Sequence, residues 1–143
     1  MTPASRRSFV LGTAALFVAA LPLAALADEK SKNKVVFQVS DSDPVKWNVA
    51  LNNIKNLQVD LQDDVDIELV VYGPGMPMLK ADSSVGKRIA ETLKTGAKVV
   101  ACENTMRGMK LVYADMLPDI GYVPAGVVEV MRKQQQGYAY IRP

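Results

Sequence analysis

The 143-residue sequence contains no histidine. Histidine titrates near neutral pH, supplies the base in Ser-His-Asp and Cys-His catalysis, and is a frequent ligand of zinc. Its absence excludes these catalytic arrangements and any zinc site that needs an imidazole. A proton-transfer group in this chain has to come from a carboxylate, a lysine or a thiol.

Cysteine is nearly as scarce, since Cys102 is the one thiol in the sequence. One cysteine cannot form a CxxC redox pair, a zinc ribbon, a single-chain iron–sulfur site or an internal disulfide. The glycine-containing turn at residues 73–76 matches neither GxGxxG nor GxxxxGK[ST], so it does not indicate a phosphate-binding loop. Three classes remain open: chemistry of a lone thiol, chemistry of a carboxylate or lysine, and a binding module. We expect no cofactor.

An excess of charge of one sign is also lacking. The sequence has 17 Lys and Arg residues against 15 Asp and Glu residues, and Arg6 and Arg7 lie in the N-terminal segment described next. Without that segment the formal net charge is zero. This balance gives no electrostatic support for binding to nucleic acid or to a membrane surface.

The first 27 residues have the pattern of an export signal. The Arg6-Arg7 pair is followed by an uncharged, apolar run over residues 9–27, which ends in the small-x-small triplet Ala25-Leu26-Ala27. We therefore expect cleavage before Asp28, a mature domain of residues 28–143, and a periplasmic location. The arginine pair resembles a twin-arginine (Tat) signal. An ordinary Sec signal and an uncleaved anchor are the alternatives, and Pro22 disfavours the anchor.

Residues 28–143 alternate between patterns typical of strands and of helices. Short, apolar, β-branched runs predict strands at residues 34–39, 67–72, 97–102, 122–125 and 138–141. Apolar residues at helical spacing predict helices at residues 44–61, from 82 or 83 to 95, from 104 or 105 to 117, and at 127–136.

This alternation predicts right-handed βαβ units. We therefore expect an α/β fold, a flavodoxin-like three-layer sandwich with a mainly parallel five-stranded sheet. The most apolar run, residues 97–102, is expected to be a buried central strand. A domain of this size gains stability from homo-oligomerisation, which we also expect.

The functional crevice of an open parallel sheet lies beyond the carboxyl ends of its strands. Cys102 ends the third expected strand and stands directly before a helix. The N–H donors and positive end of a helix lower the pKa of a thiol; Arg107 adds to this effect, whereas Glu103 opposes it if it points inward. Asn104 and Thr105 are candidate binding residues for an anion, or simple helix caps. Cys102 is the candidate catalytic thiol, and inert burial as a small hydrophobe is the alternative.

The turn after the expected strand 67–72 lies at the same edge of the sheet. Its residues Gly73, Gly75 and Met76 are candidate binding residues that form a lid or pocket wall over Cys102, or they only reverse the chain. Four methionines border this edge, at positions 76, 78, 106 and 109. A thiol with thioethers suits Cu(I), although methionine is also ordinary core filler. Because Asp41 and Asp43 lack a visible third ligand, we expect no metal site.

Four stretches resemble the DsrE/DsrF-like family: residues 99–106 (VVACENTM), 114–119 (ADMLPD), 121–126 (GYVPAG) and 135–141 (QQGYAYI). The resemblance covers residues 34–143 and implies a five-stranded parallel sheet flanked by helices and assembly as trimers or hexamers. The best understood members pass sulfur between partner proteins as a cysteine persulfide. Their sulfur-carrying cysteine sits near the end of a middle strand, so the resemblance implies that role for Cys102. Those members are cytoplasmic and have small apolar residues after the thiol, unlike residues 103–105 here.

Three functional hypotheses follow. In the first, the protein is a periplasmic, homo-oligomeric sulfur carrier that exchanges persulfide sulfur at Cys102 with a donor or acceptor protein. In the second, it is a non-catalytic module for a small ligand, and Cys102 only lines the pocket. In the third, Cys102 and the neighbouring methionines bind a soft metal ion.

Overall fold

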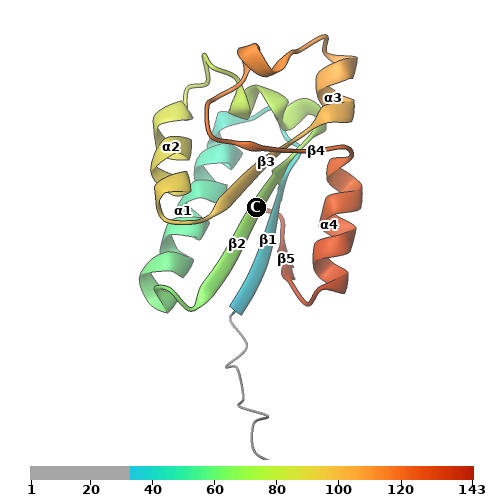
Figure 1. Ribbon diagram of the computed structural model, residues 1–143. Helices are drawn as coiled ribbons and strands as arrows, with labels where there is room; N and C mark the ends of the chain where they lie inside the picture. Colours follow the sequence, from blue (N-terminus) through green and yellow to red (C-terminus); the bar gives the residue numbers. More distant parts are fainter. Residues whose placement is uncertain (1–32) are drawn as a thin grey trace, which may run out of the picture. The chain divides into compact units, whose positions relative to one another are not determined.

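The computed structural model describes residues 33–143, which build a five-stranded sheet (Figure 1). The strands are β1 (Asn33–Val39), β2 (Val65–Val71), β3 (Lys98–Cys102), β4 (Gly121–Val123) and β5 (Ala139–Ile141). Their order is β4-β3-β2-β1-β5, and every pairing between them is parallel. The expected parallel five-stranded sheet is confirmed. The central strand is β2, whereas β3, which we expected at the centre, lies one place toward the β4 edge. The export segment, residues 1–27, and the mature start at Asp28 lie outside the described residues.

Four α-helices and two 3₁₀ helices connect these strands. They are α1 (Pro44–Leu61), η1 (Gly73–Leu79), α2 (Gly86–Lys94), α3 (Glu103–Gly108), η2 (Tyr113–Asp115) and α4 (Gly126–Gln135). Helix α1 begins where the sequence indicates, because the Asp43 carboxylate accepts a hydrogen bond from the N–H of Val45 at 2.9 Å and Pro44 occupies the first turn. None of the helices in residues 33–143 is both long and apolar enough to cross a bilayer.

The helices form two layers, one on each face of the sheet. Figure 1 shows α1 and α2 on one side and α4 on the other. Alternate residues of β1 follow this division: Phe37 packs with Leu51 of α1 and Ile89 of α2, whereas Val36 packs with Val130 of α4. The architecture is therefore the expected three-layer sandwich, with a larger core on the side of α1 and α2.

A buried ion pair fixes α4 to the sheet. The ammonium of Lys133 lies 2.6 Å from Oε2 of Glu68 on β2 and 3.7 Å from the carboxylate of Glu129. Burial raises the pKa of Glu68, although the neighbouring Lys133 opposes that rise. Removing either partner alone would leave an uncompensated buried charge, so this pair favours the observed position of α4 on the sheet.

The structure differs most from the sequence-based expectation between residues 104 and 117. The single helix that we expected there is wrong, because α3 ends at Gly108. The following segment runs back along η1: the N–H of Ala81 donates to the carbonyl of Asp115 at 2.9 Å, and the N–H of Leu117 donates to that of Leu79 at 2.8 Å. These tertiary hydrogen bonds replace the helical ones, and helical periodicity in the sequence does not reveal them.

Candidate functional site

Cys102 lies at the carboxyl edge of the sheet, as the sequence predicts. It is the last residue of β3, pairs with Val123 of β4, and is the N-cap residue of α3. It belongs to the larger core, together with Ala101 and Met106. The residue is only 4% exposed. The thiol is therefore placed just beneath the surface at the end of the strand.

Hydrogen-bond donors surround this buried thiol. Burial alone raises the pKa of Cys102, but the hydroxyl of Thr105 and the backbone N–H groups of Gly126, Thr105 and Asn104 lower it and outweigh burial. The pKa of Cys102 therefore lies below its usual value. Because α3 has six residues, this effect comes from individual N–H groups at the sulfur more than from a helix dipole. The donors favour the thiolate, which is the nucleophilic form.

Gly73 and Thr105 act together on the thiol. The N–H of Gly73 donates a hydrogen bond to Oγ1 of Thr105 at 2.9 Å. The hydroxyl oxygen of Thr105 thus accepts a hydrogen bond from Gly73. The hydroxyl proton is then free to be donated to the sulfur of Cys102. Gly73 lies in the turn after β2 and has a φ of 56°, a backbone conformation that favours glycine. Two residues predicted as binding residues thus support the thiol instead of lining an open pocket.

Asn104, Arg107 and Glu103 lie close to Cys102 in sequence but have other partners. The N–H of Asn104 also donates to the carbonyl of Pro124 at 3.2 Å, and its side-chain oxygen accepts a hydrogen bond from the guanidinium of Arg107. The Glu103 carboxylate accepts a hydrogen bond from the Tyr113 hydroxyl. Neither Arg107 nor Glu103 is among the largest influences on the pKa of Cys102.

Gly75 and Met76 belong to the packing of η1. A Cβ atom on Gly75 would lie 2.8 Å from the carbonyl oxygen of Val39, so the two chain segments pass each other as closely as glycine permits. Met76 and Met78 are fully buried in the core with α1 and α2. Their sulfur atoms therefore serve as core filler in this structure. Among residues 33–143 there is also no cluster of three or more Asp, Glu, Cys or His residues that would suit a metal ion.

Tyr72 is a site residue that the sequence analysis missed. It follows the last residue of β2, and its ring packs on Gly126, where an added Cβ would lie 2.7 Å from Cδ1 of the ring. The backbone of Gly126 is also among the groups that lower the pKa of Cys102, so Tyr72 and the thiol are both neighbours of Gly126. Burial, together with the nearby Tyr140 and Cys102, raises the pKa of Tyr72, and the nearby Arg142 lowers it. Its position one residue past a strand is the signal that could have identified it.

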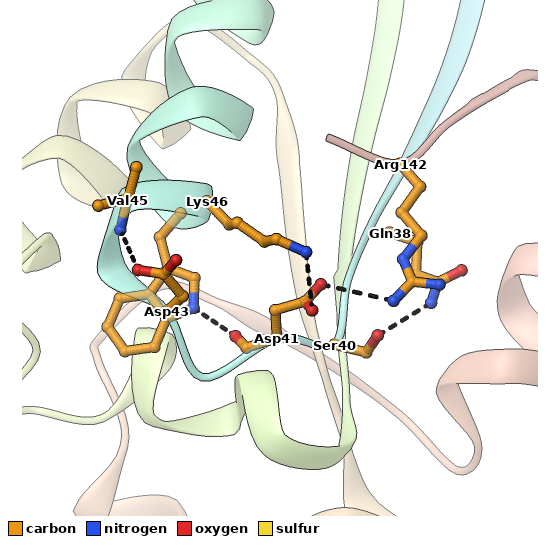
Figure 2. Close-up of polar contacts among 8 residues, drawn as sticks. Gln38, Ser40, Asp41, Asp43, Val45, Lys46 and Arg142 are labelled. Carbon is orange, nitrogen blue, oxygen red and sulfur yellow. Dashed lines mark hydrogen bonds and ion pairs between the residues drawn. The ribbon is translucent and has the colours of Figure 1, made fainter.

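A polar group continues this edge toward β5 (Figure 2). Asp41 accepts a hydrogen bond from Lys46 at 3.0 Å and pairs with Arg142 at 3.5 Å, and both contacts lower the pKa of Asp41. Gln38 donates to the hydroxyl of Ser40 at 3.1 Å and accepts a hydrogen bond from the Tyr140 hydroxyl. These contacts join the ends of β1 and β5 and the first turn of α1 by polar interactions at the same edge of the sheet.

A cavity of about 210 Å³ lies beside α3. Its lining is mostly apolar, with Arg107 and Glu103 as its charged members, and consists of Glu103, Met106, Arg107, Leu111, Val112 and Tyr113. Cys102 does not line it. The next residue in the chain, Glu103, does line it.

Comparisons with known proteins agree with this architecture. The sequence profile of the DsrE/DsrF-like family matches residues 23–143. The solved structure of MTH1491 from Methanobacterium thermoautotrophicum, a protein of unknown function, is 34% identical, with a TM-score of 0.75 over 78% of this chain and 99% of that chain.

Two more distant structures show the fold alone. BT1422 from Bacteroides thetaiotaomicron is 13% identical, with a TM-score of 0.65 over 78% of this chain and 95% of that chain. The ychN protein from E. coli is 9% identical, with a TM-score of 0.63 over 78% of this chain and 99% of that chain. No curated protein matches the chain. The profile match and the likeness to MTH1491 establish that the chain belongs to the DsrE/DsrF-like family.

Proposed function

We propose that the protein is a periplasmic sulfur carrier that accepts sulfane sulfur on Cys102 as a persulfide. The observation that carries the proposal is the set of donors around the thiol: one hydroxyl and three backbone N–H groups lower its pKa despite burial. A cysteine that only fills the core needs no such donors. The family is linked to sulfur relay, which supports the same assignment.

The chemistry requires no histidine. The Cys102 thiolate attacks the outer sulfur of a donor persulfide, R–S–SH, and forms a new S–S bond. The bond between that sulfur and the donor sulfur breaks, and the donor leaves as the thiolate R–S⁻ with the electron pair. The proton stays on the transferred sulfur, so atoms and charge balance without an oxidant. The lowered pKa of Cys102 takes the place of a general base.

Export and assembly are parts of this proposal. The Arg6-Arg7 pair and the triplet Ala25-Leu26-Ala27 support export and a mature start at Asp28. Apolar side chains that remain exposed in the single chain, Val127 and Met131 among them, support a homo-oligomer. A trimer or hexamer is the assembly that the family resemblance favours.

The test is the intact mass of the protein isolated from the periplasm, before and after treatment with inorganic polysulfide. We expect a chain that begins at Asp28 and gains about 32 Da for one added sulfur. Cys102→Ser should retain the fold and lose the added mass, because the exchange nearly preserves side-chain volume. A wild-type chain that takes up no sulfur would contradict the proposal and leave a ligand-binding module as the function.

A further inference from the structure

The register of the sheet places a tyrosine directly beside the thiol. Val71 of β2 pairs with Ala101 of β3 and with Val39 of β1. The next residues, Cys102, Tyr72 and Ser40, therefore lie at one level on neighbouring strands, about 5 Å apart. The N–H of Tyr72 donates to the carbonyl of Val39 at 3.2 Å, so the ladder does continue past the end of β2.

Arg142 reaches the same face from the other edge of the sheet. Phe37 pairs with Ile141, so Arg142 follows β5 at the level of Gln38 on β1. Figure 2 shows its guanidinium directed toward the carboxylate of Asp41, with which it pairs at 3.5 Å. The influence of both Arg142 and Cys102 on the pKa of Tyr72 agrees with this placement, in which Tyr72 lies between the arginine and the thiol.

Both groups have donor capacity that the fold leaves unused. The Tyr72 hydroxyl has no hydrogen-bond partner among residues 33–143. The side chain of Arg142 is 50% exposed, and its contact with Asp41 at 3.5 Å is longer than the 3.0 Å contact of Lys46 with the same carboxylate. A guanidinium offers five N–H donors and retains its charge at all relevant pH values. These two side chains can therefore donate to a ligand without breaking the fold.

We propose that Tyr72 and Arg142 form an anion-recognition subsite of the Cys102 site and select sulfur donors that carry negative charge. This inference rests on the proposed function of Cys102 and goes beyond it by naming the charge class of the substrate. The strand β1 lies two strand spacings from β3, roughly 10 Å away. A small anionic donor whose sulfane sulfur meets Cys102 would extend its charged end over Tyr72 toward Arg142.

The alternative is that Arg142 serves only as a structural partner of Asp41. The two roles predict different reactivity of the thiol toward negatively charged and neutral reagents. This preference does not depend on fold stability. Iodoacetate and iodoacetamide measure that preference, because they alkylate the same sulfur and differ mainly by a carboxylate in place of an amide. The ratio of their rate constants cancels changes in thiol pKa and in general accessibility.

The experiment measures this ratio at Cys102 in the folded full-length protein by intact mass, at low salt and constant pH. Arg142→Gln should lower the iodoacetate-to-iodoacetamide ratio about fivefold, with the iodoacetamide rate within twofold of wild type. Arg142→Lys, which keeps the charge, should recover at least half of the loss. Tyr72→Phe retains the ring on Gly126 and should lower the ratio about twofold.

The control is Arg132→Gln, which removes the same charge from an exposed position in the last turn of α4. It should leave the ratio unchanged. If both reagents label Cys102 and Arg142→Gln has the same ratio as wild type, the subsite is wrong and the proposed function stands. If neither reagent labels Cys102 before unfolding, the thiol is a core residue and both proposals fail.

Discussion

At the scale of single residues, the reactivity of Cys102 depends on neighbours that the sequence does not place next to it. Gly126 comes from the start of α4, and Gly73 acts through Thr105 from the end of β2. The thiol is buried, which on its own would favour the neutral form. The donors reverse that preference, so the chemical character of this cysteine depends on the folded edge as well as on its neighbours in sequence, Asn104 and Thr105.

Thr105→Val tests this arrangement directly. Valine is similar in size but cannot donate to the sulfur, so the pKa of Cys102 should rise toward its usual value. Because the thiolate is the reacting form, the pH at which alkylation reaches half its maximal rate should move upward. At pH 7 the rate with iodoacetamide should fall about threefold to tenfold.

The matched variant is Thr105→Ser, which retains the hydroxyl and should react at close to the wild-type rate. The measurement is the alkylation rate against pH on the native protein. In wild type, the midpoint should lie below the value of about 8.5 for a free thiol. An identical midpoint in wild type and Thr105→Val would show that the hydroxyl does not act on the sulfur.

At the scale of elements, close packing at the turn after β2 sets the position of η1. A Cβ on Gly75 would lie 2.8 Å from the carbonyl oxygen of Val39 and 3.1 Å from Cα of Ser40. Both neighbours are backbone atoms and cannot rotate away. Gly75→Ala should therefore lower the free energy of unfolding by about 1 to 3 kcal/mol, measured by urea denaturation.

Gly108→Ala is the comparison for that prediction. Gly108 ends α3, and a Cβ at this position meets nothing within 4 Å. Replacing this glycine should leave stability unchanged or raise it by up to about 1 kcal/mol, because alanine loses less backbone entropy on folding. Equal losses in the two variants would contradict a specific role for the close approach at Gly75.

Helices and strands whose ends are set by neighbouring residues in the sequence could be predicted. The Asp43-Pro44 pair determines where α1 starts, and the apolar run before Cys102 determines β3. Gly96 and Gly137, with φ of 87° and 86°, follow α2 and α4, and a glycine at this place is a local signal for the end of a helix. The break after Gly108 could not be predicted, because backbone hydrogen bonds to η1 decide it.

The same division holds for the candidate site. The position of Cys102 at the carboxyl edge follows from the order of strands and helices alone. Arg142 could not be assigned to it, because the sequence does not reveal that β1 lies between β2 and β5, whereas the position of Tyr72 directly after β2 was a signal that could have been used. Asn104 and Thr105, which we expected to bind an anion or to cap the helix, lower the pKa of Cys102 in the structure, whereas the guanidinium of Arg107 donates to the side chain of Asn104.

At the scale of the whole molecule, the two faces of the sheet are covered unequally. Helices α1 and α2 cover one face, and α4 alone covers the other. On α4, Val127 and Met131 lie one turn apart and are 61% and 49% exposed. The edge strands β4 and β5 have three residues each. An exposed apolar stripe beside short edge strands favours contact with a second copy of the chain.

The last prediction concerns that assembly. The wild-type protein should give the mass of a trimer or hexamer by light scattering at micromolar concentration. Met131→Lys should shift that mass to the monomer, because a lysine buried in an apolar contact loses its hydration. Val59→Lys is the control, since Val59 is 65% exposed on α1, away from α4. That variant should keep the wild-type mass. A wild-type monomer would contradict the assembly, and an oligomer that survives Met131→Lys would exclude the α4 stripe as its contact surface.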